Sequence, residues 1–285
     1  MRTHFVRRVG AVAALIAGSL VATLVPATSA GSAPPPGGWA PAATATIHPG
    51  VMMFTDGAQC TANFIFTRGT EVLIGYAAHC AGTGAATETN GCDAASLPLG
   101  TPVEIDGASQ PGTLVYSSWL AMQAVNETDA NTCAYNDFAV VRLAAADVSK
   151  VNPSIPHWGG PNGLNTTGNP LLSRLYTYGN SSLRLGLTQL SPKTGVSLGT
   201  TGGGWTHPSY TVTPGIPGDS GSALLDAQGR ASGVLSTVAL APLAGSNNFS
   251  DLSRALTYAH SHGQSGLAVE NGTEAFNPNA LPLGA

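Results

Sequence analysis

The sequence carries little charge, and lysine is almost absent from it. Only 9% of the 285 residues are charged, and the two lysines, Lys150 and Lys193, lie far apart in the chain. Nucleic-acid binding needs clustered Lys and Arg that neutralise phosphates, so we expect no nucleic-acid partner. Acidic residues also outnumber Lys and Arg, 15 to 11. The apolar fraction of 43% is nevertheless large enough for a substantial core, which excludes a disordered chain.

Long apolar runs are also scarce, and the one that matters lies at the N-terminus. Three arginines precede the run AVAALIAGSLVATLV, which stops at Pro26, and small residues follow as far as Ala30. This order is typical of a secretory signal peptide. The alternative, a membrane anchor, is disfavoured by the Gly-Ser pair within the run. We therefore expect residues 1–30 to be a signal peptide, and the protein to be secreted, extracellular and free of the membrane after cleavage.

Helical periodicity is rare, and the rest of the chain favours an all-β fold. The 36 glycines and 20 prolines indicate many turns. Between them lie short runs rich in Val, Thr, Leu and Tyr, which are typical of strands. Apolar residues at helical spacing occur near the end of the chain. The expected parts are a Pro/Gly/Ala linker or short pro-segment (31–46), a domain (47–263) with strand groups at about 47–150 and 168–248 and a helix at about 250–262, and a tail (264–285).

The four cysteines all follow the expected signal peptide. They are Cys60, Cys80, Cys92 and Cys133, and an even number in an exported chain indicates disulfides. Of the three possible pairings, Cys60–Cys80 with Cys92–Cys133 is favoured, because these bonds close short loops that do not cross in sequence. The alternative, a zinc site, is weak because no C-x-x-C or H-x-x-x-H spacing is present. We expect neither a metal nor another cofactor.

Three segments each place a chemically useful residue at a strand edge. GYAAHC ends a predicted strand with His79, YNDFAVV opens one with Asp137, and PGDSGS places Ser220 in a glycine-rich turn. A serine hydroxyl needs a base to take its proton, a histidine can be that base, and a carboxylate can orient the histidine. Each segment alone is weak evidence, but the three together favour acyl transfer. Their order, His then Asp then Ser, differs from those of α/β-hydrolases and subtilisins.

In this order AAHC, NDFAVV and GDSGS resemble the chymotrypsin/trypsin superfamily of serine proteases, especially its secreted bacterial, streptogrisin-like branch. The resemblance covers roughly residues 47–262. It implies two six-stranded antiparallel β-barrels with the site in the cleft between them. It also implies His79 as general base, Asp137 as its orienter and Ser220 as nucleophile. The backbone N–H groups of Gly218 and Ser220 would form the oxyanion hole, and a Cys60–Cys80 bond would bracket the histidine.

The resemblance also assigns a structural role to Asp219. This acid would be buried and would need a cationic or hydrogen-bonding partner. Bacterial relatives often use an internal arginine, and SRLYTYG resembles the strand that carries it, so Arg174 is the expected partner, with Arg184 as the second choice. Ser222 and Ala223 stand where most relatives have Gly-Pro, and their small side chains are compatible with catalysis.

Three further positions bear on the substrate. Pro214 aligns with the acid at the base of the trypsin pocket, so nothing there favours Lys or Arg at P1, the residue before the cleaved bond. Ser236, in the strand GVLSTV, would bind the substrate backbone, and Val238 would stand where a glycine keeps the pocket open. A branched residue at that point would narrow the pocket. We therefore expect a small or medium apolar P1 residue.

The sequence thus predicts a secreted serine endopeptidase that hydrolyses peptide bonds through an acyl-enzyme. Its expected partners are polypeptide substrates and proteinaceous inhibitors, and the expected state is a monomer. Two alternatives remain open. One is a protein that uses the protease fold for binding with little turnover, and the other is an esterase that uses the same site.

Overall fold

Short antiparallel strands build both halves of the molecule. The structure is a computed structural model that describes Met1 and residues 37–84, 88–239 and 246–281, without the side chains of residues 238 and 239. Apart from Met1, the expected signal peptide lies outside the described residues, as do the first residues of the expected linker. Among the described residues, no helix has the length and apolar character needed to cross a membrane.

The N-terminal half is a sheet that bends into a ring. Its strand order is β14-β3-β4-β7-β6-β5-β1-β2. In this order β2 and β3 lie near opposite edges of the sheet, although three residues separate them in the chain. Asn63 N–H donates to the Gly75 carbonyl at 2.9 Å and Gly75 N–H to the Phe64 carbonyl at 3.0 Å, so pairing continues through the bend. With β2 and β3 as one bent strand, six strands form a closed ring. The strands are β1 (Met52–Thr55), β2 (Ala58–Thr61), β3 (Ile65–Arg68), β4 (Glu71–Tyr76), β5 (Pro102–Ile105), β6 (Gly112–Ser117) and β7 (Ala139–Arg142), with β14 (Ala268–Val269) added outside.

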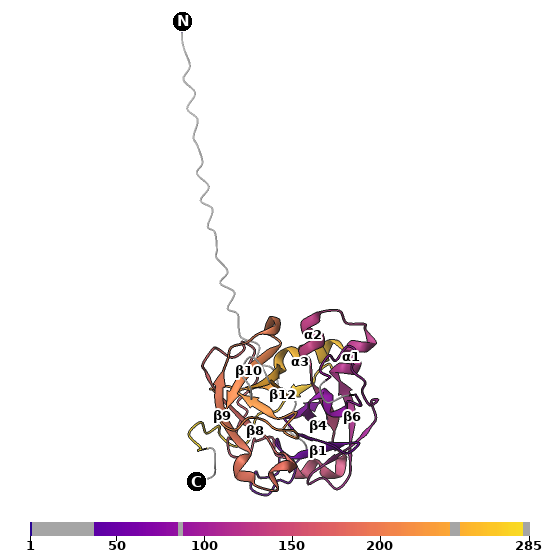
Figure 1. Ribbon diagram of the computed structural model, residues 1–285, viewed down its shortest axis with the longest axis vertical. Helices are drawn as coiled ribbons and strands as arrows, with labels where there is room; N and C mark the ends of the chain where they lie inside the picture. The colour runs from indigo at the N-terminus through magenta and orange to yellow at the C-terminus, as the bar shows by residue number, and fades with distance from the viewer. Residues whose placement is uncertain (2–36, 85–87, 240–245, 282–285) are drawn as a thin grey trace. The chain divides into compact units, whose positions relative to one another are not determined.

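The C-terminal half is a closed six-stranded barrel, with the order β10-β13-β12-β11-β8-β9. It is the orange part of Figure 1, beside the purple N-terminal strands. Leu175, Leu224, Leu235 and Phe249 form an apolar cluster within it. The strands are β8 (Arg174–Tyr178), β9 (Pro192–Ser197), β10 (Thr206–Thr211), β11 (Ala223–Leu225), β12 (Ala231–Ala239) and β13 (Ser246–Asp251).

Three α-helices accompany the sheets within the described ranges: α1 (Ser118–Ala124), α2 (Ala130–Tyr135) and α3 (Leu252–Ser261). The last is the helix expected near the end of the chain. Asp251 caps it, because its carboxylate accepts from Arg254 N–H at 2.7 Å. The buried side chains of α3 include Leu252, Ala255 and Leu256, the stripe that the helical spacing predicted.

Two segments outside the expected strand groups join the fold. Trp39, within the expected linker, packs on the core, and Ala40 N–H donates to the Val151 carbonyl at 2.9 Å. The folded part therefore begins several residues earlier than Ile47. The tail is also ordered in its described part, since β14 pairs with β3 and the Phe276 ring lies 5.1 Å from that of Tyr176.

Both expected disulfides are present, Cys60–Cys80 and Cys92–Cys133. The first joins β2 to the turn that follows β4. Among the described residues, Cys60, His79 and Cys80 are the one group whose atoms lie close enough to hold a metal ion. The two sulfurs are bonded to each other, so they cannot serve as thiolate ligands.

Candidate active site

Antiparallel pairing of β4 with β7 brings His79 and Asp137 together. Tyr76 at the end of β4 lies opposite Ala139 at the start of β7. His79 follows Tyr76 by three residues, in a short 3-10 turn, and Asp137 precedes Ala139 by two. The end of one strand and the start of its antiparallel neighbour meet at the same edge of the sheet. Residues 58 positions apart in the sequence therefore become neighbours.

Asp137 holds His79 by two hydrogen bonds. The Nδ1 atom of His79 lies 2.7 Å from Asp137 Oδ2, and the backbone N–H of His79 donates to Oδ1 at 2.9 Å. Burial tends to lower the pKa of His79, but the Asp137 carboxylate outweighs it and raises that pKa above its usual value. Burial conversely tends to raise the pKa of Asp137, while His79 and Ser236 hold it below its usual value. The pair thus favours a charged carboxylate and leaves Nε2 of the imidazole as the free nitrogen.

Ser236 supports the carboxylate from the other barrel. Its Oγ donates to Asp137 Oδ2 at 2.6 Å. Ser236 lies at a register shift in β12, between Leu235 and Thr237, and such bulges redirect a side chain. This contact joins the two halves of the molecule at the site. The sequence predicted a substrate-binding role for Ser236 and missed its hydrogen bond to Asp137.

Ser220 lies in the loop between β10 and β11. This loop packs against the end of β2 and against Ala77, which follows β4 and precedes His79 by two residues. Thr61 N–H donates to the Ser220 carbonyl at 2.8 Å. A Cβ added to Gly221, whose φ is +88°, would lie 2.5 Å from the Thr61 carbonyl and 3.0 Å from Ala77 N. Glycine is therefore required for this close approach.

Ser220 itself is half-buried. Within the described residues, its Oγ forms no hydrogen bond with His79. Catalytic hydrogen bonds are often long before substrate binds, so this geometry is compatible with a nucleophile.

In the part of the chain that the structure describes, the backbone N–H groups of Gly218 and Ser220 have no acceptor. The other N–H groups of residues 215–222 all have acceptors in the protein, apart from Pro217, which has no N–H. Gly218 and Ser220 are half-buried, so their two N–H groups, on either side of Asp219, are available to an acceptor from outside the protein. The donor–acceptor pairs are Gly215 to Asn247 Oδ1 (3.0 Å), Ile216 to Asp219 Oδ2 (3.1 Å), Asp219 to the Ile216 carbonyl (2.9 Å), Gly221 to the Leu235 carbonyl (2.7 Å) and Ser222 to the Asp219 carbonyl (3.0 Å).

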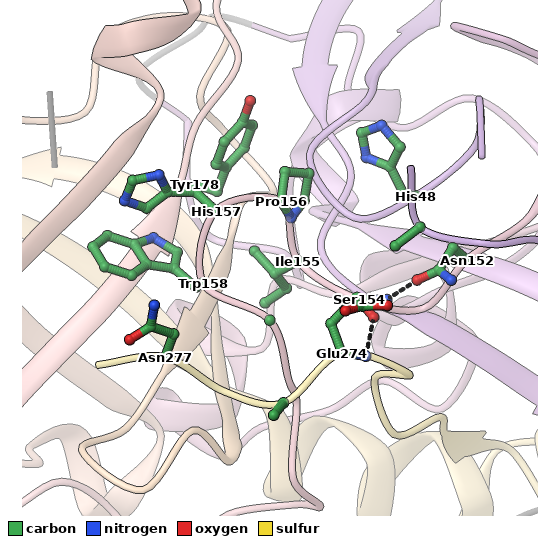
Figure 2. Close-up of a pocket in the computed structure, with 13 residues that line it drawn as sticks. His48, Asn152, Ser154, Ile155, Pro156, His157, Trp158, Tyr178, Glu274 and Asn277 are labelled. Carbon is green, nitrogen blue, oxygen red and sulfur yellow. Dashed lines mark hydrogen bonds between the residues drawn. The ribbon is translucent and has the colours of Figure 1, made fainter. Parts of the chain in front are cut away.

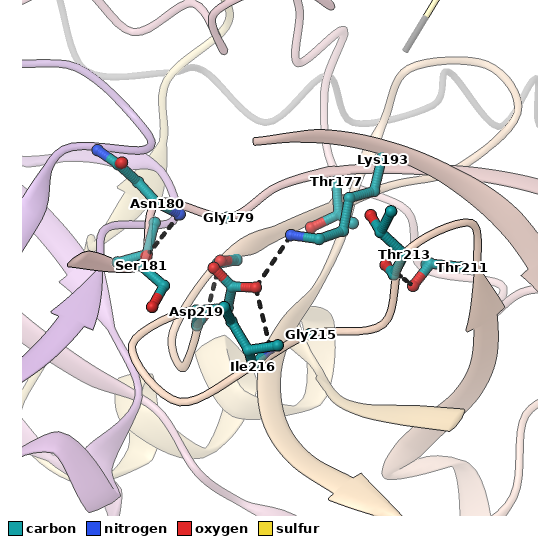
Figure 3. Close-up of polar contacts among 12 residues, drawn as sticks. Thr177, Gly179, Asn180, Ser181, Lys193, Thr211, Thr213, Gly215, Ile216 and Asp219 are labelled. Carbon is teal, nitrogen blue, oxygen red and sulfur yellow. Dashed lines mark hydrogen bonds and ion pairs between the residues drawn. The ribbon is translucent and has the colours of Figure 1, made fainter. Parts of the chain in front are cut away.

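Asp219 is fully buried and binds two cations. Arg184 contacts it through two hydrogen bonds of 2.5 Å. Lys193 Nζ lies 3.0 Å from Oδ2, and Figure 3 shows this lysine reaching the carboxylate. Arg184 is 8% exposed and Lys193 2%. Burial tends to raise the pKa of Asp219, but Arg184 and Lys193 hold it below its usual value. Burial also lowers the pKa of Lys193, against the attraction of the carboxylate.

The expected partner of Asp219, Arg174, is wrong. Arg174 is exposed at the first position of β8 and forms none of these contacts. The second choice, Arg184, forms the ion pair, because the turn after β8 directs it inward. Lys193 on β9 was missed, and the one sequence signal for it is the scarcity of lysine. Ser222, which stands where the resemblance led us to expect glycine, donates from Oγ to the Asp219 carbonyl at 2.5 Å and so braces the same loop.

The other two residues expected to bind substrate are Pro214 and Val238. Pro214 is exposed at the start of the loop. Val238 lies on β12 opposite Asn247 of β13, and its side chain lies outside the described residues.

A cavity of about 490 Å³ lies elsewhere, between the segment 152–159 and the tail (Figure 2). His48, His157 and Glu274 are among its lining residues, but none of the three expected catalytic residues lines it. It is therefore separate from the candidate active site.

Comparison with solved structures finds bacterial proteases. Thermobifida fusca protease A is 19% identical, with a TM-score of 0.51, over 79% of this chain and 99% of its own. Cellulomonas bogoriensis chymotrypsin and a Nocardiopsis protease match at 20% and 17% identity, each over 79% of this chain and 98% of its own, with TM-scores of 0.47. No protein-family model and no curated protein matches the chain. The first likeness shows the fold, a chymotrypsin-like double β-barrel with a C-terminal helix.

Replacing Arg184 by Met tests the anchor of the loop. Arg184→Met leaves Asp219 buried with one cation, so we expect the free energy of unfolding at neutral pH to fall by about 3 kcal/mol. The matched control is Arg174→Met, which changes an exposed arginine and should alter stability by less than about 0.5 kcal/mol. Chemical denaturation of both variants measures the difference. Equal stabilities for the two variants would contradict the assignment of Arg184 as the anchor.

Proposed function

We propose that this protein is a secreted serine endopeptidase. The observation that carries the proposal is the meeting of three features: an imidazole oriented by a buried carboxylate, a half-buried serine in an adjoining loop, and two N–H groups without an acceptor among the described residues, one on that serine and one on the glycine two residues before it. These are the parts that acyl transfer requires. The chymotrypsin-like fold and the serine proteases that share it support the same conclusion.

The reaction follows from the roles of these groups. Ser220 Oγ attacks the carbonyl carbon of the scissile peptide bond while His79 Nε2 takes its proton. The carbonyl oxygen becomes an oxyanion, which the N–H groups of Gly218 and Ser220 stabilise. His79 then gives the proton to the leaving amine, and the C–N bond breaks to leave an ester on Ser220. A water molecule, deprotonated by His79, hydrolyses that ester and restores the serine.

Asp137 contributes by orientation and charge. Its Oδ2 accepts from Nδ1 of His79, which fixes the tautomer with the free electron pair on Nε2. Its negative charge also stabilises the imidazolium that forms when His79 takes the proton. Because Ser236 and the backbone of His79 both donate to Asp137, the carboxylate is already in place before substrate arrives. Preorganisation of this kind avoids a rearrangement during the reaction.

Secretion is part of the proposal. Two disulfides indicate an oxidising compartment, and the N-terminal sequence is typical of a signal peptide. Polypeptides are the proposed substrates, and we propose that the chain acts as a monomer. The residue named P1 is proposed to be small or medium and apolar, because Pro214 supplies no charge and Val238 would narrow the pocket.

Labelling by a fluorophosphonate tests the proposed chemistry. We expect one covalent adduct per chain, on Ser220, and none on the variant Ser220→Ala; peptide mapping by mass spectrometry locates it. The rate of labelling should fall as the pH drops, because only neutral His79 can take the serine proton. Since the pKa of His79 is raised, the midpoint should lie above about pH 6.5, and Asp137→Asn should move it to lower pH.

A folded, secreted chain that gives no adduct on Ser220 would overturn the proposal that the protein is an enzyme. That result would favour the alternative, a protein that uses the protease fold for binding. An adduct without peptide hydrolysis, but with ester hydrolysis, would favour an esterase.

A peptide library tests the proposed P1 preference. We expect cleavage after residues such as Ala or Val, and Val238→Gly should extend cleavage to larger apolar residues because it widens the pocket. The wild-type chain and the variant are compared by kcat/KM on peptides that differ only at P1. Preference of the wild-type chain for Lys, Arg or another charged P1 residue would refute this part of the proposal.

A further inference from the structure

We propose that Ser181 is a positioning residue that holds the oxyanion-hole peptide in its working orientation. The effect of this contact on catalysis rests on the proposed function. Its effect on the backbone of the loop does not. The peptide concerned joins Pro217 to Gly218.

Residues 216–219 form a β-turn that can exist in two forms. Asp219 N–H donates to the Ile216 carbonyl at 2.9 Å, so Pro217 and Gly218 are the two central residues. The φ of +95° at Gly218 identifies a type II turn. A type I turn would keep the same closing hydrogen bond, and it also favours proline at the first central position. The two forms differ mainly by a rotation of the central peptide through roughly 180°.

That rotation decides whether the Gly218 N–H is available to an oxyanion. The C=O and N–H groups of a trans peptide point in opposite directions. In the type II form the Gly218 N–H is free of protein acceptors within the described residues. In the type I form the Pro217 carbonyl would take its place, and an oxygen atom there would repel the oxyanion. Glycine at position 218 allows either form, so a contact outside the turn must select between them.

Ser181 supplies that contact. Its Oγ donates to the Pro217 carbonyl at 2.5 Å and accepts from Leu183 N–H at 3.2 Å. Ser181 lies just after β8 and is 2% exposed, so water cannot easily replace the carbonyl as its acceptor. Because Ser181 binds the carbonyl on one side, the N–H of the same peptide points to the other side. Figure 3 shows Ser181 beside Asn180, facing the loop that carries Asp219.

The next peptide of the loop is held from the N-terminal sheet. The Gly218 carbonyl accepts from Gln59 Nε2 at 3.0 Å and from Thr61 Oγ1 at 2.8 Å. Gln59 also accepts from Ser182 N–H at 3.0 Å through its Oε1, so it steadies the segment that carries Ser181. Both peptides that flank Gly218 are therefore fixed by side chains outside the loop. The Ser181 contact is the one that selects the direction of the Gly218 N–H.

The crystal structure of Ser181→Ala tests the structural part directly. We expect the Pro217 carbonyl, once it has lost its donor, to rotate in a substantial fraction of molecules, giving Gly218 a negative φ. Ser181→Thr keeps the hydroxyl and should retain the type II turn. The matched control is Ser173→Ala, which removes a hydroxyl that donates to the Pro170 carbonyl at 2.7 Å, away from this loop. A fully occupied type II turn in Ser181→Ala would overturn the proposal.

Kinetics test the catalytic part. Loss of the hydroxyl should lower kcat about tenfold, because it removes the hydrogen bond that holds the Pro217 carbonyl, and should leave KM unchanged, because the oxyanion is absent from the bound substrate and develops during the reaction. Ser181→Thr should restore most of kcat, and Ser173→Ala should match the wild type. An unchanged kcat in Ser181→Ala would overturn the positioning role. If the wild-type chain hydrolyses no peptide, the proposed function fails, while the turn seen in the crystal still decides the structural part.

Discussion

The buried ion cluster of Asp219 with Arg184 and Lys193 is the interaction on which the candidate site depends. A carboxylate removed from water is strongly unfavourable unless charge and hydrogen bonds compensate for it. Two cations and the Ile216 N–H do so here. Asp219 precedes Ser220, so these contacts fix the loop where the proposed nucleophile and the N–H groups of the proposed oxyanion hole lie. The cluster ties this loop to β9 and to the turn after β8.

The two halves of the molecule each supply part of the site, and hydrogen bonds join them. The N-terminal sheet supplies His79 and Asp137 through the β4–β7 pairing, and the C-terminal barrel supplies Ser220. Ser236 crosses from the barrel to Asp137, while Gln59 crosses from the sheet to the Gly218 carbonyl. Relative motion of the halves would break both contacts, so docking of the halves and formation of the site are coupled. The Cys60–Cys80 bond adds a covalent tie beside the histidine.

Much of this arrangement could be predicted from local sequence, and the exceptions are informative. His79, Asp137 and Ser220 lie in short motifs at strand edges, and the cysteine pairing followed from sequence spacing. The partner of Asp219 did not, because the resemblance favoured Arg174 over Arg184, and it is the path of the turn after β8 that directs Arg184 inward. Lys193 could not be predicted, since its partner lies 26 residues away in the loop between β10 and β11. The two-residue strand β14 was likewise too short to show any periodicity.

The most direct test of the account is a crystal structure of the protein with a peptide boronic acid bound. A boronate on the nucleophile imitates the tetrahedral intermediate of acyl transfer. We predict a covalent bond from boron to Ser220 Oγ, with one boronate oxygen about 2.7–3.1 Å from the backbone N atoms of Gly218 and Ser220. His79 Nε2 should lie within hydrogen-bonding distance of another boronate oxygen. A boronate bound elsewhere, or an oxygen facing away from Gly218 and Ser220, would contradict the assignment of this loop as the catalytic centre.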